Sequence, residues 1–143
     1  MMAKEFLNRA YRIDCRINNK CEQLERLKAL ASSASMNYGG EQVSHSRKTD
    51  TLENNILRII EAEHELDEQI DILIEMKKEI QQVIDLVADP DCRVLLEMRY
   101  LCMKRWQDIG ATMELGRTQT YKLHMKALAM VETVLRTMEA QHG

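Results

Sequence analysis

The chain is poor in the residues that turn or flatten a backbone. Its 143 residues include one proline, five glycines and only 4% aromatic side chains. Sheet-rich folds need frequent turns and are enriched in aromatic and β-branched residues, so this composition argues against them. What remains is 45% hydrophobic and 30% charged, the balance of a helical protein with few turns. The sequence therefore predicts an all-α fold of one or two small domains.

Several functional signatures are also missing. No run of 18 apolar residues occurs, and the charged residues among the first ten do not fit a signal peptide. The sequence contains no P-loop, dinucleotide fingerprint, HExxH motif or nucleophile elbow. We therefore expect no catalytic residues, no cofactor and no membrane contact, and we do not expect an enzyme.

Metal-binding patterns are weak as well. The four cysteines form no CxxC pair and lie in separate apolar segments, at Cys15, Cys21, Cys92 and Cys102. Glu61 and His64 stand three residues apart, as in carboxylate-bridged di-iron bundles, but such bundles need this motif twice and two further glutamates. We predict reduced cysteines in a cytoplasmic protein and no metal site.

Charge is distributed unevenly along the chain. Residues 1–89 hold 12 Lys and Arg against 17 Asp and Glu, whereas residues 90–143 hold 8 against 6. The first part is therefore acidic by five charges, and the last part is basic by two. This split indicates that only the C-terminal segment approaches polyanions such as nucleic acid.

The first segment predicts one long amphipathic helix followed by a loop. Seven of eight positions at alternating steps of four and three are apolar, which makes a single stripe. The stripe consists of Phe6, Ala10, Ile13, Ile17, Lys20, Leu24, Leu27 and Ala31. Residues 32–50 then lose the periodicity and collect serines and glycines. This composition predicts a flexible loop over 32–50.

A second long helix is predicted from Asp50, where Asp50 and Glu53 resemble a capping box, to Asp89 before Pro90. Nine of its eleven stripe positions are apolar. They are Leu52, Ile56, Ile59, Glu63, Leu66, Ile70, Leu73, Lys77, Ile80, Ile84 and Val87. Two helices with one stripe each fold back most simply on each other, so residues 1–89 are predicted to form a coiled-coil-like antiparallel hairpin.

Some apolar residues of the second helix lie outside this narrow stripe. They are Ile60, Ile72, Ile74, Met76, Val83 and Leu86. Such surface needs a partner, which can be a second copy, another protein or the C-terminal part of the same chain. We expect a homodimer.

Residues 90–143 change to shorter helical patterns. Asp89 can cap a helix that has Pro90 at its first position and runs on to Met103, with Val94, Leu95, Met98 and Leu101 facing inward. Two further helices, from Trp106 to Met113 and from Thr118 onward, flank a short segment that contains Gly116. This is the layout of a helix-turn-helix domain. Its predicted core consists of Ile109, Met113, Leu115, Thr120, Leu123, Ala127 and Leu128, and Ala111 is placed where the helices approach closely.

The segment WQDIGATMELGRTQTYKLHMKAL resembles the DNA-binding region 4 of sigma-70-type factors, with Ile109, Gly110 and Leu123 in the family's positions. Together with LLEMRYLCMKRWQDIG and the N-terminal AKEFLNRAYRIDCRINNKCEQLERLKALA, it is similar to small phage and prophage transcriptional regulators of the ArpU and RinA type. The resemblance implies control of phage genes. Glu114 and Gly116 depart from it, because sigma factors place the turn glycine and a capping serine there.

The exposed face of the last helix supplies the candidate contacts to duplex DNA. Side chains that can read base edges or bind phosphate are Arg117, Thr118, Gln119, Tyr121 and Lys122. Lys104 and Arg105, just before the helix-turn-helix, are predicted to contact the DNA backbone. His124, beside the inward Leu123, is interpreted as a structural residue or a phosphate contact.

The sequence thus predicts a phage-type transcriptional regulator in the cytoplasm of a bacterial host, associated with the nucleoid. Its partners are double-stranded DNA and, through the helical hairpin, RNA polymerase. Two alternatives stay open. One is a phage inhibitor or adaptor that keeps the fold without binding DNA, and the other is a small DNA-packaging subunit that forms rings.

Overall fold

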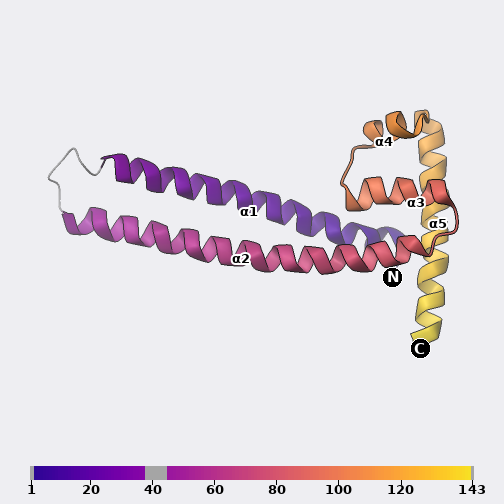
Figure 1. The fold of residues 1–143 in the computed structure, drawn as a ribbon, viewed down its shortest axis with the longest axis horizontal. Coiled ribbons are helices and arrows are strands. Elements are labelled where there is room, and N and C mark those ends of the chain that lie inside the picture. Colours follow the sequence, from indigo (N-terminus) through magenta and orange to yellow (C-terminus); the bar gives the residue numbers. More distant parts are fainter. Residues whose placement is uncertain (1, 38–44, 143) are drawn as a thin grey trace. The chain divides into compact units, whose positions relative to one another are not determined.

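The computed structural model describes residues 2–37 and 45–142, with side chains placed for residues 2–33 and 51–142. The described residues form helices and no strand, so the all-α prediction is confirmed. The elements in chain order are α1 (Ala3–Asn37), α2 (His45–Asp85), α3 (Pro90–Leu96), the π-helix η1 (Glu97–Leu101), α4 (Trp106–Met113) and α5 (Arg117–His142) (Figure 1). No described helix is long and apolar enough to cross a lipid bilayer.

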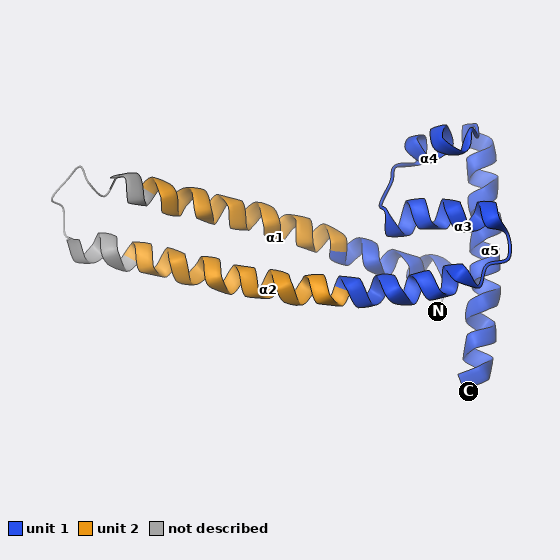
Figure 2. Cartoon of the chain, viewed as in Figure 1, with its two compact units in different colours: residues 1–13, 73–143 blue, residues 14–72 orange. Residues whose placement is uncertain are grey.

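The chain divides into two compact units. Unit 1 comprises residues 1–13 and 73–143, and unit 2 comprises residues 14–72 (Figure 2). The long helices α1 and α2 therefore each contribute to both units. The boundary between the units does not coincide with the predicted boundary at residue 89.

In unit 2 the helices α1 and α2 run antiparallel. Lys20 Nζ lies 3.0 Å from Glu65 Oε2, and Lys28 Nζ lies 3.4 Å from Glu63 Oε1. As the residue number rises along α1, it falls along α2. Ile17 and Leu24 of α1 are buried, as the α1 stripe predicts.

Between Leu52 and Ile70 the predicted stripe of α2 is right at every second position and wrong between them. Leu52, Ile59 and Leu66 are half-buried, but Ile56 and Ile70 are 46% and 36% exposed. The intervening half-buried positions lie one residue earlier, at Asn55, Ala62, Gln69 and Met76. The seam thus alternates steps of three and four from Leu52 to Val87, the spacing of a coiled coil. At Ile56 and Ile70 the sequence pattern selected the more apolar of two neighbouring positions, whereas the half-buried position is the residue before each, Asn55 and Gln69.

The loop predicted over residues 32–50 is too long. Helix α1 continues to Asn37, and α2 begins at His45 instead of Asp50. Serine costs a helix only about 0.5 kcal/mol relative to alanine, so the serines after Ala31 do not end α1. Residues 38–44, where the rest of the predicted loop falls, lie outside the described residues.

Unit 1 contains the start of α1 and the end of α2 together with the C-terminal helices. Arg9 Nη1 lies 3.6 Å from Glu79 Oε2, so the two long helices are also neighbours here. Leu7, Ile80 and Ile84 are almost fully buried, and Ile84 and Val83 show that this part of α2 buries two adjacent positions. Both the observed seam and the predicted stripe are therefore covered in unit 1.

Helix α2 ends at Asp85, four residues before the predicted end. The amides of Leu86 and Val87 donate to carbonyls three residues back, to Val83 O at 3.1 Å and Ile84 O at 2.9 Å. Such i to i−3 hydrogen bonds tighten a last turn and terminate the α-helix. In this last turn Leu86 is 61% exposed and Val87 is buried.

The segment after Pro90 is only partly α-helical. After α3 the backbone passes into the π-helix η1, which ends at Leu101, two residues before the predicted end at Met103. Leu95 and Met98 are buried as predicted and Leu101 is half-buried, but Val94 is 44% exposed. Helix α4 has the predicted bounds, and α5 begins at Arg117, one residue before the predicted start.

Candidate nucleic-acid interface

Helices α4 and α5 are joined by three residues, Glu114 to Gly116. Glu114 adopts the left-handed conformation with φ 57° and ψ 41° at the end of α4. The Leu115 amide then donates to Gly110 O at 2.9 Å, and the Thr120 amide donates to Gly116 O at the same distance. Glycine enters the left-handed region without steric cost, whereas a residue with a side chain rarely adopts it. The connection therefore contains a left-handed turn at a residue that is not glycine.

At Gly110, α4 lies close to the α4–α5 connection and to α5. A Cβ atom placed there would lie 3.0 Å from Leu115 O and 3.3 Å from Thr120 Oγ1. Thr120 is buried, and its hydroxyl donates to Gly116 O at 2.9 Å. The sequence prediction assigned this role to Ala111, which is exposed, and that assignment is wrong by one residue.

A small core holds α4 on the rest of unit 1. Leu95, Met98 and Ile109 are buried together, and Trp106, Met113 and Leu123 pack partly buried against them. The seven residues predicted to face inward are all buried or half-buried. Trp106 at the first position of α4 is half-buried.

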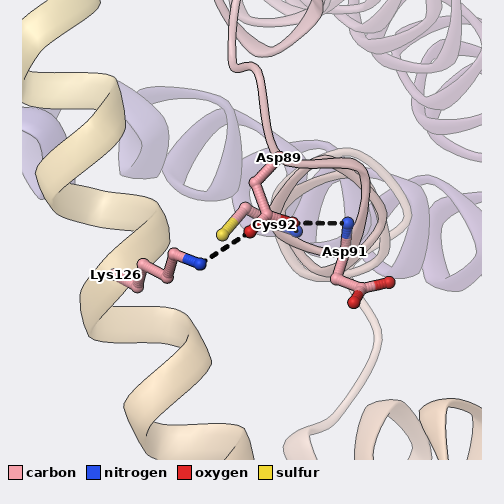
Figure 3. A network of polar contacts seen from close by, with 4 residues as sticks. All are labelled: Asp89, Asp91, Cys92 and Lys126. Atoms are coloured by element: carbon pink, nitrogen blue, oxygen red, sulfur yellow. Dashed lines mark hydrogen bonds and ion pairs between the residues drawn. The ribbon is translucent and has the colours of Figure 1, made fainter.

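One carboxylate connects α3 to α5. Asp89 Oδ1 accepts hydrogen bonds from the amides of Asp91 (2.9 Å) and Cys92 (3.2 Å), and Asp89 Oδ2 accepts from Lys126 Nζ at 2.7 Å (Figure 3). The predicted cap at Asp89 with Pro90 in the first turn is confirmed. The Lys126 hydrogen bond and the two backbone donors hold the pKa of Asp89 below its usual value. Lys126 is thereby committed to an intramolecular ion pair.

His124 is the centre of a buried polar and aromatic cluster. Its Nε2 shares a 2.6 Å hydrogen bond with the hydroxyl of Tyr100, and its ring lies 4.4 Å from that of Trp106, centroid to centroid. The guanidinium of Arg99 sits 4.7 Å above the Trp106 ring. Burial, and then the positive charges of Lys4 and Arg99, lower the pKa of His124 to about 4. The imidazole is therefore neutral at pH 7 and structural, as one of the two sequence interpretations held.

The predicted DNA contacts of α5 all lie on its exposed surface. Arg117, Thr118, Gln119, Tyr121 and Lys122 are exposed, and Tyr121 is exposed by 62%. No carboxylate occurs on α5 before Glu132. The first four turns of the helix thus present only positive or neutral side chains.

Four of these five residues line one of two hollows beside α5, and Thr118 lines neither. Arg117 and Tyr121 line the larger one, while Gln119 and Lys122 line the smaller one together with Asp91 and Lys126. Lys104 and Arg105 are exposed but line neither hollow, and Arg105 Nε lies 3.4 Å from Asp108 Oδ2. The predicted site residues therefore form a surface around α5 with Lys104 and Arg105 outside its hollows.

The larger hollow, called here the basic cleft, has a volume of about 860 Å³. Besides Arg117 and Tyr121 its walls include Lys4 and Asn8 of α1 and Arg99 of η1. Sequence reasoning missed these three residues. Lys4 and Arg99 lie more than ninety positions apart along the chain, and no periodicity or motif connects the three residues.

Comparison with known proteins places the chain in a family. No curated protein and no solved structure matches the chain. A family model described as "Protein of unknown function (DUF1492)" matches residues 30–132, which is well over half of the chain. That match carries no link to sigma-type domains or to regulators of the ArpU and RinA type. The chain belongs to the DUF1492 family.

Proposed function

We propose that the protein binds duplex DNA through the N-terminal half of α5. The observation that carries the proposal is the charge of this surface. Arg117 and Lys122 lie on the first two turns of α5, which carries no carboxylate before Glu132, in a protein whose net charge is −3. A basic face on an otherwise acidic protein is the electrostatic footprint of a nucleic-acid contact.

Each exposed side chain then has a distinct role. Arg117 stands in the first turn, the end of a recognition helix that enters the major groove, where a guanidinium can bind guanine O6 and N7 together. Gln119 can pair with adenine, and Lys122 binds phosphate as a point charge. Lys126 is excluded because Asp89 holds its ammonium group.

The proposal extends to transcriptional regulation, with RNA polymerase as an expected protein partner. This step rests on the resemblance of residues 106–128 to region 4 of sigma-type factors and of the longer segments to the ArpU and RinA regulators. The short α4–α5 connection and the close approach at Gly110 support the resemblance, because both are features of a tightly packed helix-turn-helix.

The test is fluorescence anisotropy of duplex DNA at several salt concentrations, with a random-sequence duplex and a duplex enriched from a random pool. Arg117→Ala should weaken the enriched duplex by a factor of about 10 and relax the preference at one base pair. Lys122→Ala should weaken both duplexes about equally and lower the slope of log K against log salt by about 0.9. Arg136→Ala is the matched control, an exposed cation near the other end of α5.

Binding that is unchanged in the Arg117 and Lys122 variants, or reduced as strongly by Arg136→Ala, would contradict the proposal. Circular dichroism of each variant guards against loss of fold. A protein that binds no duplex at low salt would favour the second candidate function, a phage interaction protein.

This second candidate is favoured by one observation in unit 2. Ile56, Leu57 and Ile60 of α2 are exposed by 46%, 56% and 56%, and Ile72 is exposed by 43%. Apolar side chains gathered on one helix are typical of a surface that contacts another protein. The expected homodimer would cover them, and light scattering distinguishes a dimer from a monomer or from the ring of a packaging subunit.

A further inference from the structure

The walls of the basic cleft contain three cationic side chains and no carboxylate. Lys4, Arg99 and Arg117 come from α1, η1 and α5, while the other walls are aromatic, apolar or neutral polar groups. Some other exposed cations of unit 1 have a carboxylate as ion-pair partner, as Arg105 has Asp108 and Lys126 has Asp89. A concave surface lined by unneutralised positive charge attracts and concentrates anions.

The first turn of α1 is fixed in place, so Lys4 is a positioned cation and not a loose end. The amide of Ala3 donates to Glu132 Oε2 of α5 at 2.8 Å. Phe6 and Leu7, two and three residues after Lys4, are buried, whereas Lys4 itself is exposed. The backbone is therefore held before Lys4 at Ala3 and after it at Phe6, while the Lys4 side chain lines the cleft.

Arg99 is positioned as firmly. Its Nη1 donates to Lys104 O at 3.0 Å, and its guanidinium lies over the Trp106 ring. The remaining N–H groups of the guanidinium can donate to an anion. Both Lys4 and Arg99 act electrostatically on His124, which places the two charges around the same buried ring.

We propose that Lys4 and Arg99 bind a phosphate of the DNA strand that borders the groove occupied by α5. The inference rests on the proposed function, and it adds the start of α1 to the DNA-binding surface. Arg117 and Tyr121 line the same cleft, so a backbone phosphate held there would lie beside the base-reading face of α5. Contacts of this kind fix the position and orientation of a recognition helix on the duplex.

Phosphate on an organic group can also come from a free nucleotide, and the experiment separates the two sources. Anisotropy titrations use the full chain with a random-sequence duplex and with an enriched duplex over a range of salt. Lys4→Gln should weaken both duplexes about threefold to tenfold and lower the salt slope by about 0.9. Lys4→Arg should restore both values, because it keeps the charge.

Arg12→Gln is the matched control. Arg12 is an exposed cation on the same helix and in the same unit, but it lies outside the cleft, so its loss should leave affinity and salt slope unchanged. Lys4→Glu provides a second variant with a larger expected loss. Circular dichroism confirms that each variant is folded.

Three results would overturn the inference. Wild-type affinity and slope in Lys4→Gln, while Arg117→Ala still weakens binding, would refute the Lys4 contact and leave the proposed function intact. If neither Lys4→Gln nor Arg117→Ala changed DNA binding, both the Lys4 contact and the proposed function would be refuted. Lys4-dependent binding of adenosine monophosphate, measured by calorimetry, without a Lys4 effect on DNA would assign the cleft to a free nucleotide.

Discussion

The two units differ in how they are stabilised. Ile17 and Leu24 are the only buried hydrophobic side chains in the described part of unit 2, and all the others belong to unit 1. Unit 2 is a pair of helices with a single seam, flanked by exposed ion pairs. Unit 1 packs five helical segments and the start of α1 together.

This difference arises from the number of neighbours that each apolar stripe meets. In unit 1 both the seam position Val83 and the adjacent Ile84 are buried, since α2 has neighbours on two sides there. In unit 2 the seam position Asn55 is half-buried while the adjacent Ile56 is exposed. The same helix therefore carries an apolar stripe that is covered at one end and uncovered at the other.

The largest expected effect is the loss of a buried isoleucine from unit 1. Ile84→Ala should lower the free energy of unfolding by about 2 to 5 kcal/mol, because Ile84 is fully buried and its loss leaves a cavity. Ile56→Ala, the same change on the same helix in unit 2, should alter it by no more than about 0.5 kcal/mol. The measurement is urea denaturation followed by the fluorescence of Trp106, the single tryptophan.

Because Trp106 belongs to unit 1, its fluorescence reports that unit, and far-ultraviolet circular dichroism reports the helices of both. Equal losses in the two variants would mean that Ile56 is covered in solution, as by a second copy. The difference in burial between Ile84 and Ile56 would then hold for a monomer but not for the protein in solution.

Periodicity predicted much of this arrangement, and its errors have a physical reason. The stripe of α1 was predicted correctly because its apolar residues occupy one face, with Ile17 and Leu24 on the seam. On α2 two adjacent positions compete at each turn, and hydrophobicity alone favours Ile56 and Ile70 over Asn55 and Gln69. Only the pairing with α1 decides between them, and a single-helix pattern does not contain that information.

An intermediate effect is expected from pH, through the buried imidazole of unit 1. The pKa of His124 is lowered from 6.5 in the unfolded chain to about 4 in the fold. The unfolded chain therefore binds more protons between these values, and stability falls as pH drops from about 6.5 to about 4. The neutral imidazole should contribute about 1 to 3 kcal/mol above pH 6.5.

Urea denaturation at a series of pH values between 4 and 7 measures this dependence. In His124→Gln the free energy of unfolding should depend less on pH over this range, because the variant lacks the imidazole that binds a proton on unfolding. Unit 2 has no buried titratable side chain among its described residues, so its helicity at a given urea concentration should vary less with pH. An unchanged pH dependence in His124→Gln would mean that the imidazole is solvated and charged in the fold.

For the candidate site, sequence reasoning identified the exposed face of α5 but not its surroundings. Arg117 and Lys122 follow from helical spacing next to Leu123, which is local information. Lys4 and Arg99 reach the same cleft as Arg117 only because α1 and η1 both pack near α5. Such a convergence depends on tertiary structure, so no motif could have predicted it.

The smallest expected effect is a gain of stability in unit 2. Asn55 is a half-buried polar residue on the seam, and Asn54, one residue earlier, is exposed. Asn55→Leu should stabilise this part of α2 by about 0.5 to 1 kcal/mol more than Asn54→Leu, because only the first adds apolar surface to the contact with α1. Both changes raise helix propensity equally, so the comparison cancels that contribution. Hydrogen exchange of amides in residues 51–72 measures the difference in local stability between the two variants, because slower exchange in Asn55→Leu reports rarer local opening. Equal protection in the two variants would place the seam elsewhere and return Ile56 to the face that packs on α1.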